Sequence, residues 1–272
     1  MRRAPVVGAL VIAVCVVVVA GVTLWPRIAP APPTISVPST MPPLVVGSST
    51  ADMTVSDLLE QRDRLVNISI VGDGTGRTLG AWVFAFAQQL GITYGRPAQI
   101  REWRFGSRQS YTSPRQAFPG TGRPVTIWNA SASRNVRYFA QTAQRWMPPV
   151  RTDVVLVSNG FDDTGIGLSA QSVALMKEVA AVNPGAAVVA VIQPVRPDRR
   201  PQAPGQDDIA RDMRTSLGIN DLPYIDVAGR LDGPESSALF GTGRELMAPA
   251  GYLRWGEIVD EAMRSVAVRS AS

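Results

Sequence analysis

Apolar and polar positions follow two alternating patterns after Asn67. Short apolar runs of strand length, each bounded by turn residues, occupy 68–71, 125–128, 154–157, 187–192 and 224–227. Apolar residues recur at helical spacing in 79–90, 135–146, 169–182, 207–217 and 249–266. The last segment begins with Pro249, which favours a helix start, and should bury Trp255, Val259, Met263 and Val266. This alternation predicts a three-layer αβα sandwich with a mainly parallel, flavodoxin-like sheet.

A longer apolar run precedes this domain. Between Arg3 and Arg27 lie 23 uncharged residues, enough for a helix to cross about 30 Å of hydrocarbon. Because Arg2 and Arg3 come first, the positive-inside rule predicts a cytoplasmic N-terminus and an extracytoplasmic domain. A cleaved secretory signal is the alternative, since residues 19–21 offer small side chains for cleavage. The apolar run continues to Trp25, which favours an uncleaved transmembrane helix over residues 1–25.

Residues 26–50 are rich in proline, with seven prolines between positions 26 and 43. Such a segment favours an extended polyproline II conformation and acts as a spacer. We interpret it as a linker without a partner of its own. The globular domain then occupies residues 51–272.

Composition narrows the chemistry of the domain. The chain has one Cys and no His, which excludes a disulfide framework within it and removes the commonest general base and metal ligand. The sequence pI is about 10.0, but from Ala51 onward 24 basic residues face 22 acidic ones. The domain is therefore close to neutral, and we expect no nucleic-acid partner.

Four loops that follow predicted strands or precede the last helix carry related motifs. Ligands of parallel α/β sheets bind at this edge. The motifs are Gly72-Asp73-Gly74-Thr75-Gly76, Asn129-Ala130-Ser131-Ala132-Ser133-Arg134, Ser158-Asn159-Gly160-Phe161-Asp162-Asp163 and Gly243 to Tyr252. In order and spacing they resemble the G-D-S, N-A-S-x-S-G, G-x-N-D and D-G-x-H-x-S-P-A-G-Y blocks of the SGNH (GDSL-type) esterases and lipases. The resemblance covers residues 68–266 and implies the fold of that family.

The resemblance also implies where the family's catalytic groups would lie. The nucleophilic Ser falls at Gly74, the His base at Leu246 and the acid that orients this base at Gly243. The two oxyanion donors fall at Arg134 and at Asp162, whose charge would repel an oxyanion. Nucleophile and base act as a unit, so the loss of both predicts a degenerate, catalytically inactive member.

Carboxylates at the strand ends leave a second enzymatic interpretation open. Asp73, Asp162, Asp163 and Glu245 could converge in a metal site or an acid–base pair. For Asp73 and Asp163 we favour structural hydrogen bonding to loop backbone. Arg134 and Asp162 could form a salt bridge across the inactive site. The ligand-binding candidates are Asp73, Thr75, Arg134, Asp162 and Asp163, and we expect neither a metal nor a cofactor.

Arginine and aromatic residues are interspersed in segment 101–123. It holds five Arg and one acid, with aromatic residues at Trp103, Phe105, Tyr111 and Phe118. Such a mixture can bind sugars, phosphates or anionic polymers. We favour the simpler interpretation of an edge strand followed by a solvated loop, and we interpret the basic loop 197–201 as solvated too.

Two functions remain from the sequence. The preferred one is a membrane-anchored, extracytoplasmic, catalytically inactive SGNH-hydrolase-like protein that binds an envelope glycan, a lipid or other acylated component, or a protein partner. The alternative is an ester hydrolase or acyltransferase that uses residues other than those of the family.

Overall fold

The computed structural model describes residues 53–77, 80–106, 109–161, 167–194, 205–232, 236–241 and 247–268. The predicted transmembrane segment 1–25 and the linker 26–50 lie outside these ranges. Within the described ranges, no helix combines the length and apolar character that a membrane crossing requires.

A seven-stranded sheet forms the centre of the domain, in the order β4-β3-β5-β2-β6-β7-β8. Every neighbouring pair is parallel except β3 and β4, which are antiparallel. The strands are β2 (Val66–Gly72), β3 (Ala98–Glu102), β4 (Arg115–Phe118), β5 (Val125–Ser131), β6 (Val154–Ser158), β7 (Ala187–Ile192) and β8 (Tyr224–Asp226). All five predicted strands are confirmed, and the mainly parallel sheet with them.

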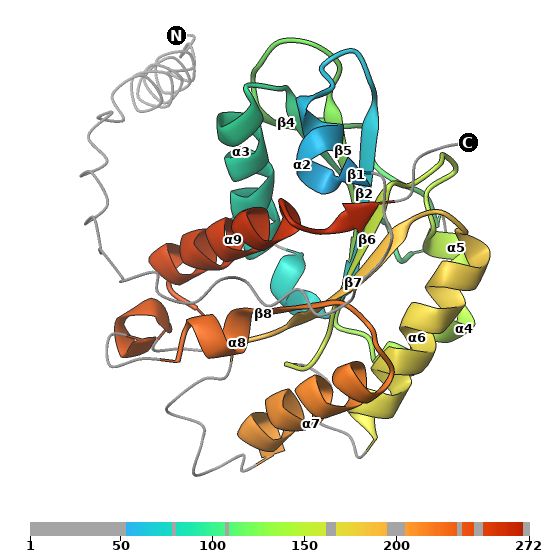
Figure 1. The fold of residues 1–272 in the computed structure, drawn as a ribbon, viewed down its shortest axis with the longest axis vertical. Helices are drawn as coiled ribbons and strands as arrows, with labels where there is room; N and C mark the ends of the chain where they lie inside the picture. The colour runs from blue at the N-terminus through green and yellow to red at the C-terminus, as the bar shows by residue number, and fades with distance from the viewer. Residues whose placement is uncertain are drawn as a thin grey trace, which may run out of the picture. The chain divides into compact units, whose positions relative to one another are not determined.

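Helices cover both faces of this sheet (Figure 1). On one face lie α2 (Val55–Glu60), α3 (Trp82–Tyr94) and α9 (Pro249–Met263), whose apolar side chains join one core. The other face carries α4 (Val136–Gln141), α5 (Ala143–Trp146), α6 (Leu168–Val182) and α7 (Gly205–Ile219), which contribute to a second core. Short helices α8 (Val227–Arg230), η1 (Gly74–Gly76) and η3 (Ser236–Leu239) complete the described elements. The predicted three layers are therefore present.

The central strands are apolar on both faces because both are covered. On β2, Ile68 and Ile70 point into the core beneath α3 and α9, whereas Val71 points into the core beneath α4 and α6. The register pairs Ile68 with Ile127 of β5 and with Val154 of β6. A slip by one residue would exchange the two faces, so burial on both sides fixes this register.

Helices α3 and α9 pack closely against each other. The ring of Trp82 stacks on that of Trp255, with centroids 5.2 Å apart and planes inclined by 10°. A Cβ atom at Gly256 would lie 2.5 Å from the backbone nitrogen of Phe86, so the crossing requires glycine there. The four residues predicted to face inward from this last helix are all buried, as its spacing indicated.

The structure corrects the sequence interpretation at two places. The predicted helix 135–146 is divided into α4 and α5 at Thr142, whose hydroxyl donates to the carbonyl of Tyr138 and whose ψ of 15° leaves the helical range. Segment 101–123 does contain an edge strand, β4, but this strand follows the loop instead of preceding it as expected. The loop before it is not fully solvated, because Trp103, Phe105 and Tyr111 are partly buried.

Arg96 lies buried at the amino-terminal edge of the sheet, with no exposed surface. Its guanidinium donates to the backbone carbonyls of Leu59, Gln61, Arg64 and Arg123. Burial lowers the pKa of Arg96 from its ordinary value, chiefly through desolvation. The carbonyl oxygens nevertheless satisfy its donors, so Arg96 joins α2 to the loop that precedes β5.

A second, two-stranded sheet joins the two ends of the described domain. β1 (Met53–Thr54) pairs antiparallel with β9 (Ala267–Val268), through Met53 with Val268 and Thr54 with Ala267. The side chain of Thr54 caps α2 in a reciprocal pair with Asp57.

Candidate functional site

The candidate site lies at the carboxyl ends of β2, β5, β6 and β7, where the described parts of three family-like motifs, 72–76, 129–134 and 158–161, meet. The turn after β2 packs closely against the ends of β5 and β6. A Cβ atom at Gly72 would lie 2.2 Å from the carbonyl oxygen of Ser158, and one at Gly76 would lie 2.5 Å from Oγ of Ser131. Both glycines are therefore required by the close approach of three strand ends, which holds the turn rigidly.

Asp73 is the polar centre of this turn, with 1% of its surface exposed. Its Oδ1 accepts hydrogen bonds from the backbone nitrogen of Thr75 at 3.1 Å, Oγ1 of Thr75 at 2.7 Å and Nε2 of Gln193 at 3.1 Å. Its Oδ2 accepts from the backbone nitrogens of Gly160 at 3.2 Å and Phe161 at 2.9 Å. One carboxylate thus joins the ends of β2, β6 and β7.

These contacts decide what Asp73 can do chemically. Burial raises the pKa of the Asp73 carboxyl above its ordinary value, and the hydrogen bonds from Thr75, Gln193 and Phe161 oppose that rise. Both oxygens are occupied by donors from described residues, and the side chain faces the protein interior. Asp73 therefore has the structural role predicted for it and is not placed to attack a substrate or to exchange a proton with one.

Gly74, at the position of the family's nucleophile, begins the short helix η1 directly after Asp73. The backbone follows the expected strand–turn–helix path, but no side chain projects from it. Thr75, one of the ligand-binding candidates, is also buried, and its hydroxyl donates to Asp73. The turn therefore presents backbone and no reactive side chain at this point.

The end of β5 is held by an internal pair of hydrogen bonds. Nδ2 of Asn129 donates to the carbonyl of Gly76 at 2.8 Å, and its Oδ1 accepts from the backbone nitrogen of Ser131 at 3.1 Å. Arg134, farther along this loop, is exposed, and its guanidinium lies 5.6 Å from the ring centroid of Tyr138. Its expected partner Asp162 lies outside the described residues, so the salt bridge between them stays a prediction.

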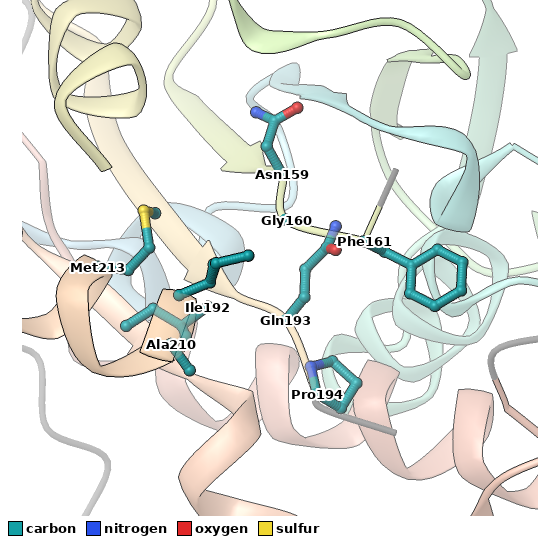
Figure 2. Close-up of a pocket in the computed structure, with 9 residues that line it drawn as sticks. Asn159, Gly160, Phe161, Ile192, Gln193, Pro194, Ala210 and Met213 are labelled. Carbon is teal, nitrogen blue, oxygen red and sulfur yellow. The ribbon is translucent and has the colours of Figure 1, made fainter. Parts of the chain in front are cut away.

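A small pocket opens between the ends of β6 and β7 and helix α7 (Figure 2). It lies beside Asp73, because Gly160, Phe161 and Gln193 of its lining donate hydrogen bonds to that carboxylate. Its polar wall is formed by Asn159 and Gln193, and its apolar wall by Ile192, Ala210 and Met213. Its volume of about 20 Å³ is enough for one water molecule or a group of that size.

Two buried amides line this pocket. Asn159 and Gln193 are 3% and 6% exposed. In the described part of the chain, neither amide atom of Asn159 has a hydrogen-bond partner, nor does Oε1 of Gln193. Buried amide groups are rarely left unpaired, because each costs about 1–3 kcal/mol of stability. The pocket therefore offers one donor nitrogen and two acceptor oxygens to a polar group that enters it.

The sequence analysis did not single out Asn159 or Gln193. Asn159 stood inside a motif whose oxyanion donor was assigned to Asp162, and Gln193 is the first residue after the apolar run 187–192. The position of Gln193 at the end of a predicted strand was the one sequence signal that could have marked it as a site residue. Asp162, Asp163, Gly243, Glu245 and Leu246 all lie outside the described residues, so the structure tests none of their proposed roles.

No group of three or more His, Cys, Asp or Glu side chains suited to a metal occurs in the described ranges. Asp73 is the described member of the four carboxylates considered for such a site, and protein donors enclose it. What the described site provides is a rigid turn, the unpaired amide of Asn159, the unpaired Oε1 of Gln193 and an apolar wall.

The domain is thus an α/β protein with a mainly parallel sheet between helices and a glycine-rich turn after its central strand. Comparison with solved structures narrows this class. A lipase/acylhydrolase from Enterococcus faecalis matches with a TM-score of 0.53 at 12% identity, over 73% of this chain and 95% of its own. A peptidoglycan O-acetylesterase gives 0.52 at 9% identity, over 77% and 93%.

An acetyl xylan esterase from Geobacillus stearothermophilus gives a TM-score of 0.51 at 11% identity, over 75% of this chain and 97% of its own. The domain has the SGNH hydrolase fold, as the sequence motifs implied. No protein-family model and no curated protein matches the sequence.

Proposed function

We propose that this protein is a catalytically inactive SGNH-type domain that binds an acylated glycan of the cell envelope. The observation that carries the proposal is Gly74, which stands at the nucleophile's place in an otherwise well-formed turn. Ester hydrolysis of the family's kind needs a nucleophile and a base. The chain has no His at all, and Leu246 occupies the position that the resemblance gives to the base.

Among the residues that the structure describes, the neighbouring side chains do not replace these groups. Ser158 is 1% exposed, and its Oγ accepts a hydrogen bond from Gln193 at 3.1 Å. An amide is not a general base, so it cannot activate this hydroxyl. Asp73 is enclosed by donors. Binding without turnover is the function that this chemistry supports.

The polar pocket suggests what kind of group is bound. Nδ2 and Oδ1 of Asn159 and Oε1 of Gln193 are the polar atoms open to a ligand. A volume of about 20 Å³ admits one oxygen-sized group, so the carbonyl oxygen of an O-acetyl group would enter the pocket while its methyl group stays at the mouth. Two of the similar structures are described as a peptidoglycan O-acetylesterase and an acetyl xylan esterase, which supports a sugar ester as the ligand.

The membrane location is part of the same proposal. It is supported by the uncharged run between Arg3 and Arg27, by the two Arg before it and by the proline-rich linker after it. A domain held outside the cytoplasm on such a linker meets envelope polysaccharides directly.

The absence of catalysis is tested on the full chain in detergent. We expect no labelling by a fluorophosphonate that modifies active serines, and no hydrolysis of short-chain aryl esters above a blank. An active SGNH esterase serves as the positive control. Turnover that persists through purification and is lost in Asp162→Asn or Glu245→Gln would favour the alternative, an enzyme that uses other residues.

Binding is tested with acetylated and deacetylated xylo-oligosaccharides by calorimetry. We expect the acetylated form to bind more tightly and Asn159→Leu to remove that preference. Gln116→Leu, at an exposed position on β4, makes a similar chemical change away from the pocket and should leave binding unaltered. Equal affinity for both sugars would contradict an ester-binding pocket.

A further inference from the structure

A second cavity lies on the sheet face that carries α4, α5 and α6, over β3 and β5. Its volume is about 660 Å³, within the range of roughly 300–1,000 Å³ typical of small-molecule sites. It shares no lining residue with the pocket beside Asp73. We call it the β3–β5 groove.

A hairpin that extends β3 builds one wall of this groove. Trp103 and Tyr111 form an antiparallel bridge, and the backbone nitrogen of Arg104 donates to the carbonyl of Ser110 at 3.0 Å. The hydroxyl of Tyr111 donates to the carbonyl of Trp146, which attaches the hairpin to α5. Burial raises the pKa of Tyr111, so this hydroxyl stays protonated as a donor at neutral pH.

Three aromatic rings stand in sequence along the groove. Tyr111 lies 5.1 Å from Trp103 and 4.9 Å from Trp128, with inclined planes in both pairs. The indole nitrogen of Trp128 donates to Oδ1 of Asn67 at 3.0 Å, which fixes the orientation of this ring. The result is a preformed aromatic wall that needs little ordering when a ligand binds.

Positive charge lines the same groove. Arg101 lies over Trp128 with its guanidinium carbon 5.1 Å from the ring centroid, and Arg145 is exposed on α5. No acidic side chain is among the described residues that line the groove. An anion that enters therefore meets two guanidinium groups, each able to bind a carboxylate or a phosphate through paired hydrogen bonds.

We propose that the β3–β5 groove binds an anionic saccharide, a sugar that carries a carboxylate or a phosphate. The apolar C–H faces of a sugar ring carry a slight positive charge, and they stack on the negative faces of the partly exposed Trp103 and Tyr111. Trp128 is 7% exposed and lies beneath Arg101, so it positions Tyr111 and Arg101 and does not itself stack on the sugar. Gln109, Ser110 and Gln144 lie exposed along the groove and can hydrogen-bond to sugar hydroxyls. The two guanidinium groups select the charged substituent.

Other ligand classes fit less well. Single-stranded nucleic acid is bound by grooves that follow a backbone over about 4–16 nucleotides with many cations. Here two cations line a bounded cavity in a domain that has 24 basic and 22 acidic residues after position 50. A free inorganic anion would make no use of the aromatic wall.

The test uses the full chain in detergent and three probes of equal length. They are an oligogalacturonate, a singly phosphorylated manno-oligosaccharide and neutral cello-oligosaccharide, titrated by calorimetry. We expect at least one acidic probe to bind about tenfold more tightly than the neutral one, since a hydrogen bond to a charged group is worth about that factor or more. The stronger acidic probe identifies the substituent as carboxylate or phosphate.

Arg145→Glu should weaken acidic-probe binding at least tenfold, and Arg101→Gln should weaken it in the same direction. Arg137→Glu is the matched control, because Arg137 is an exposed arginine of the neighbouring helix α4 that does not line the groove. The Arg137→Glu variant should bind the acidic probe with the same affinity as the unaltered protein. Circular dichroism shows whether each variant is folded. Because Arg145 is exposed, its replacement tests binding even if replacing Arg101 disturbs the fold.

Five results would overturn the proposal, of which four concern the groove itself. They are no binding of either acidic probe, equal affinity for the neutral probe, full affinity retained by Arg145→Glu and Arg101→Gln, or tighter binding of a ten-nucleotide oligothymidylate through the same arginines. Loss of acidic-probe binding in Asn159→Leu would also overturn it, because the ligand would then occupy the pocket beside Asp73. The two sites have no residue in common, so this proposal and that for the ester pocket fail independently.

Discussion

Nε2 of Gln193 donates to Oδ1 of Asp73 over 3.1 Å, and this bond connects the end of β7 to the turn after β2. The same nitrogen lies 3.3 Å from Oγ1 of Thr75 and 3.1 Å from Oγ of Ser158. Strand β7 is thus joined to the turn after the central strand β2 through buried polar atoms. The arrangement supports the shape of the site independently of any catalytic group.

Asp73→Asn should destabilise the domain by about 2 kcal/mol or more. An amide cannot accept all the hydrogen bonds that the carboxylate receives, and its own NH₂ group would face buried donors. Urea unfolding followed by circular dichroism measures the change. Asp212→Asn, at an exposed position on α7, should alter stability by less than about 0.5 kcal/mol. A similar small effect at Asp73 would contradict its structural role.

Gly72→Ala should destabilise the domain by about 1–3 kcal/mol, because the new methyl group would collide with the carbonyl oxygen of Ser158 and force β2 and β6 apart. Gly218→Ala is the control, since a Cβ atom there meets nothing within 4 Å. In helix α7 that change should be neutral or stabilising by up to about 1 kcal/mol. Thermal unfolding of the two variants should therefore shift in opposite directions or differ clearly in size.

Asn159→Leu should leave the free energy of unfolding unchanged or raise it. The amide is buried and has no partner among the described residues, so its replacement removes a desolvated polar group without breaking a bond. The same variant should lose the preference for acetylated sugar. Marked destabilisation by this change would show that the amide is satisfied within the protein and is not available to a ligand.

Restoring the family's residues should restore chemistry. The combined variant Gly74→Ser, Arg134→Gly, Asp162→Asn, Gly243→Asp and Leu246→His should show measurable hydrolysis of short-chain aryl esters, since the fold already supplies the strand–turn–helix geometry. The four-fold variant that keeps Leu246 should stay inactive for want of a base. Equal rates for the two variants would argue against the assignment of position 246.

The full chain should remain in the membrane fraction after alkaline extraction, with its C-terminus outside the cytoplasm. This follows from the uncharged run after Arg3 and from the positive-inside rule. A C-terminal alkaline phosphatase fusion, which is active only outside the cytoplasm, should report activity. Release of the domain by alkaline extraction would favour cleavage of the segment instead.

The sheet and its main helices could be predicted because their apolar spacing reflects burial directly. Ile68 and Val71 belong to a continuous apolar run since both faces of β2 are covered. The structural role of Asp73 was implied by the resemblance of residues 72–76 to the first motif of the SGNH family. These signals are local, and the sequence displays them within a few residues.

The features that could not be predicted depend on distant contacts. Gln193 and Asp73 are 120 residues apart, and no sequence pattern in either segment predicts the hydrogen bond between them. Arg96 has an ordinary sequence setting, yet backbone carbonyls from three other segments surround its guanidinium. The β3–β5 groove likewise depends on contacts of Tyr111 with both Trp103 and Trp128. The composition of segment 101–123 could therefore suggest a ligand but could not predict the groove.

The pairing of β1 with β9 has a consequence for the order in which this domain is made. Met53 precedes the rest of the fold, and its partner Val268 follows it. Synthesis proceeds from the N-terminus, so the first strand has no partner until the whole domain has been synthesised. A chain that stops before Ala267 therefore leaves β1 without its partner strand.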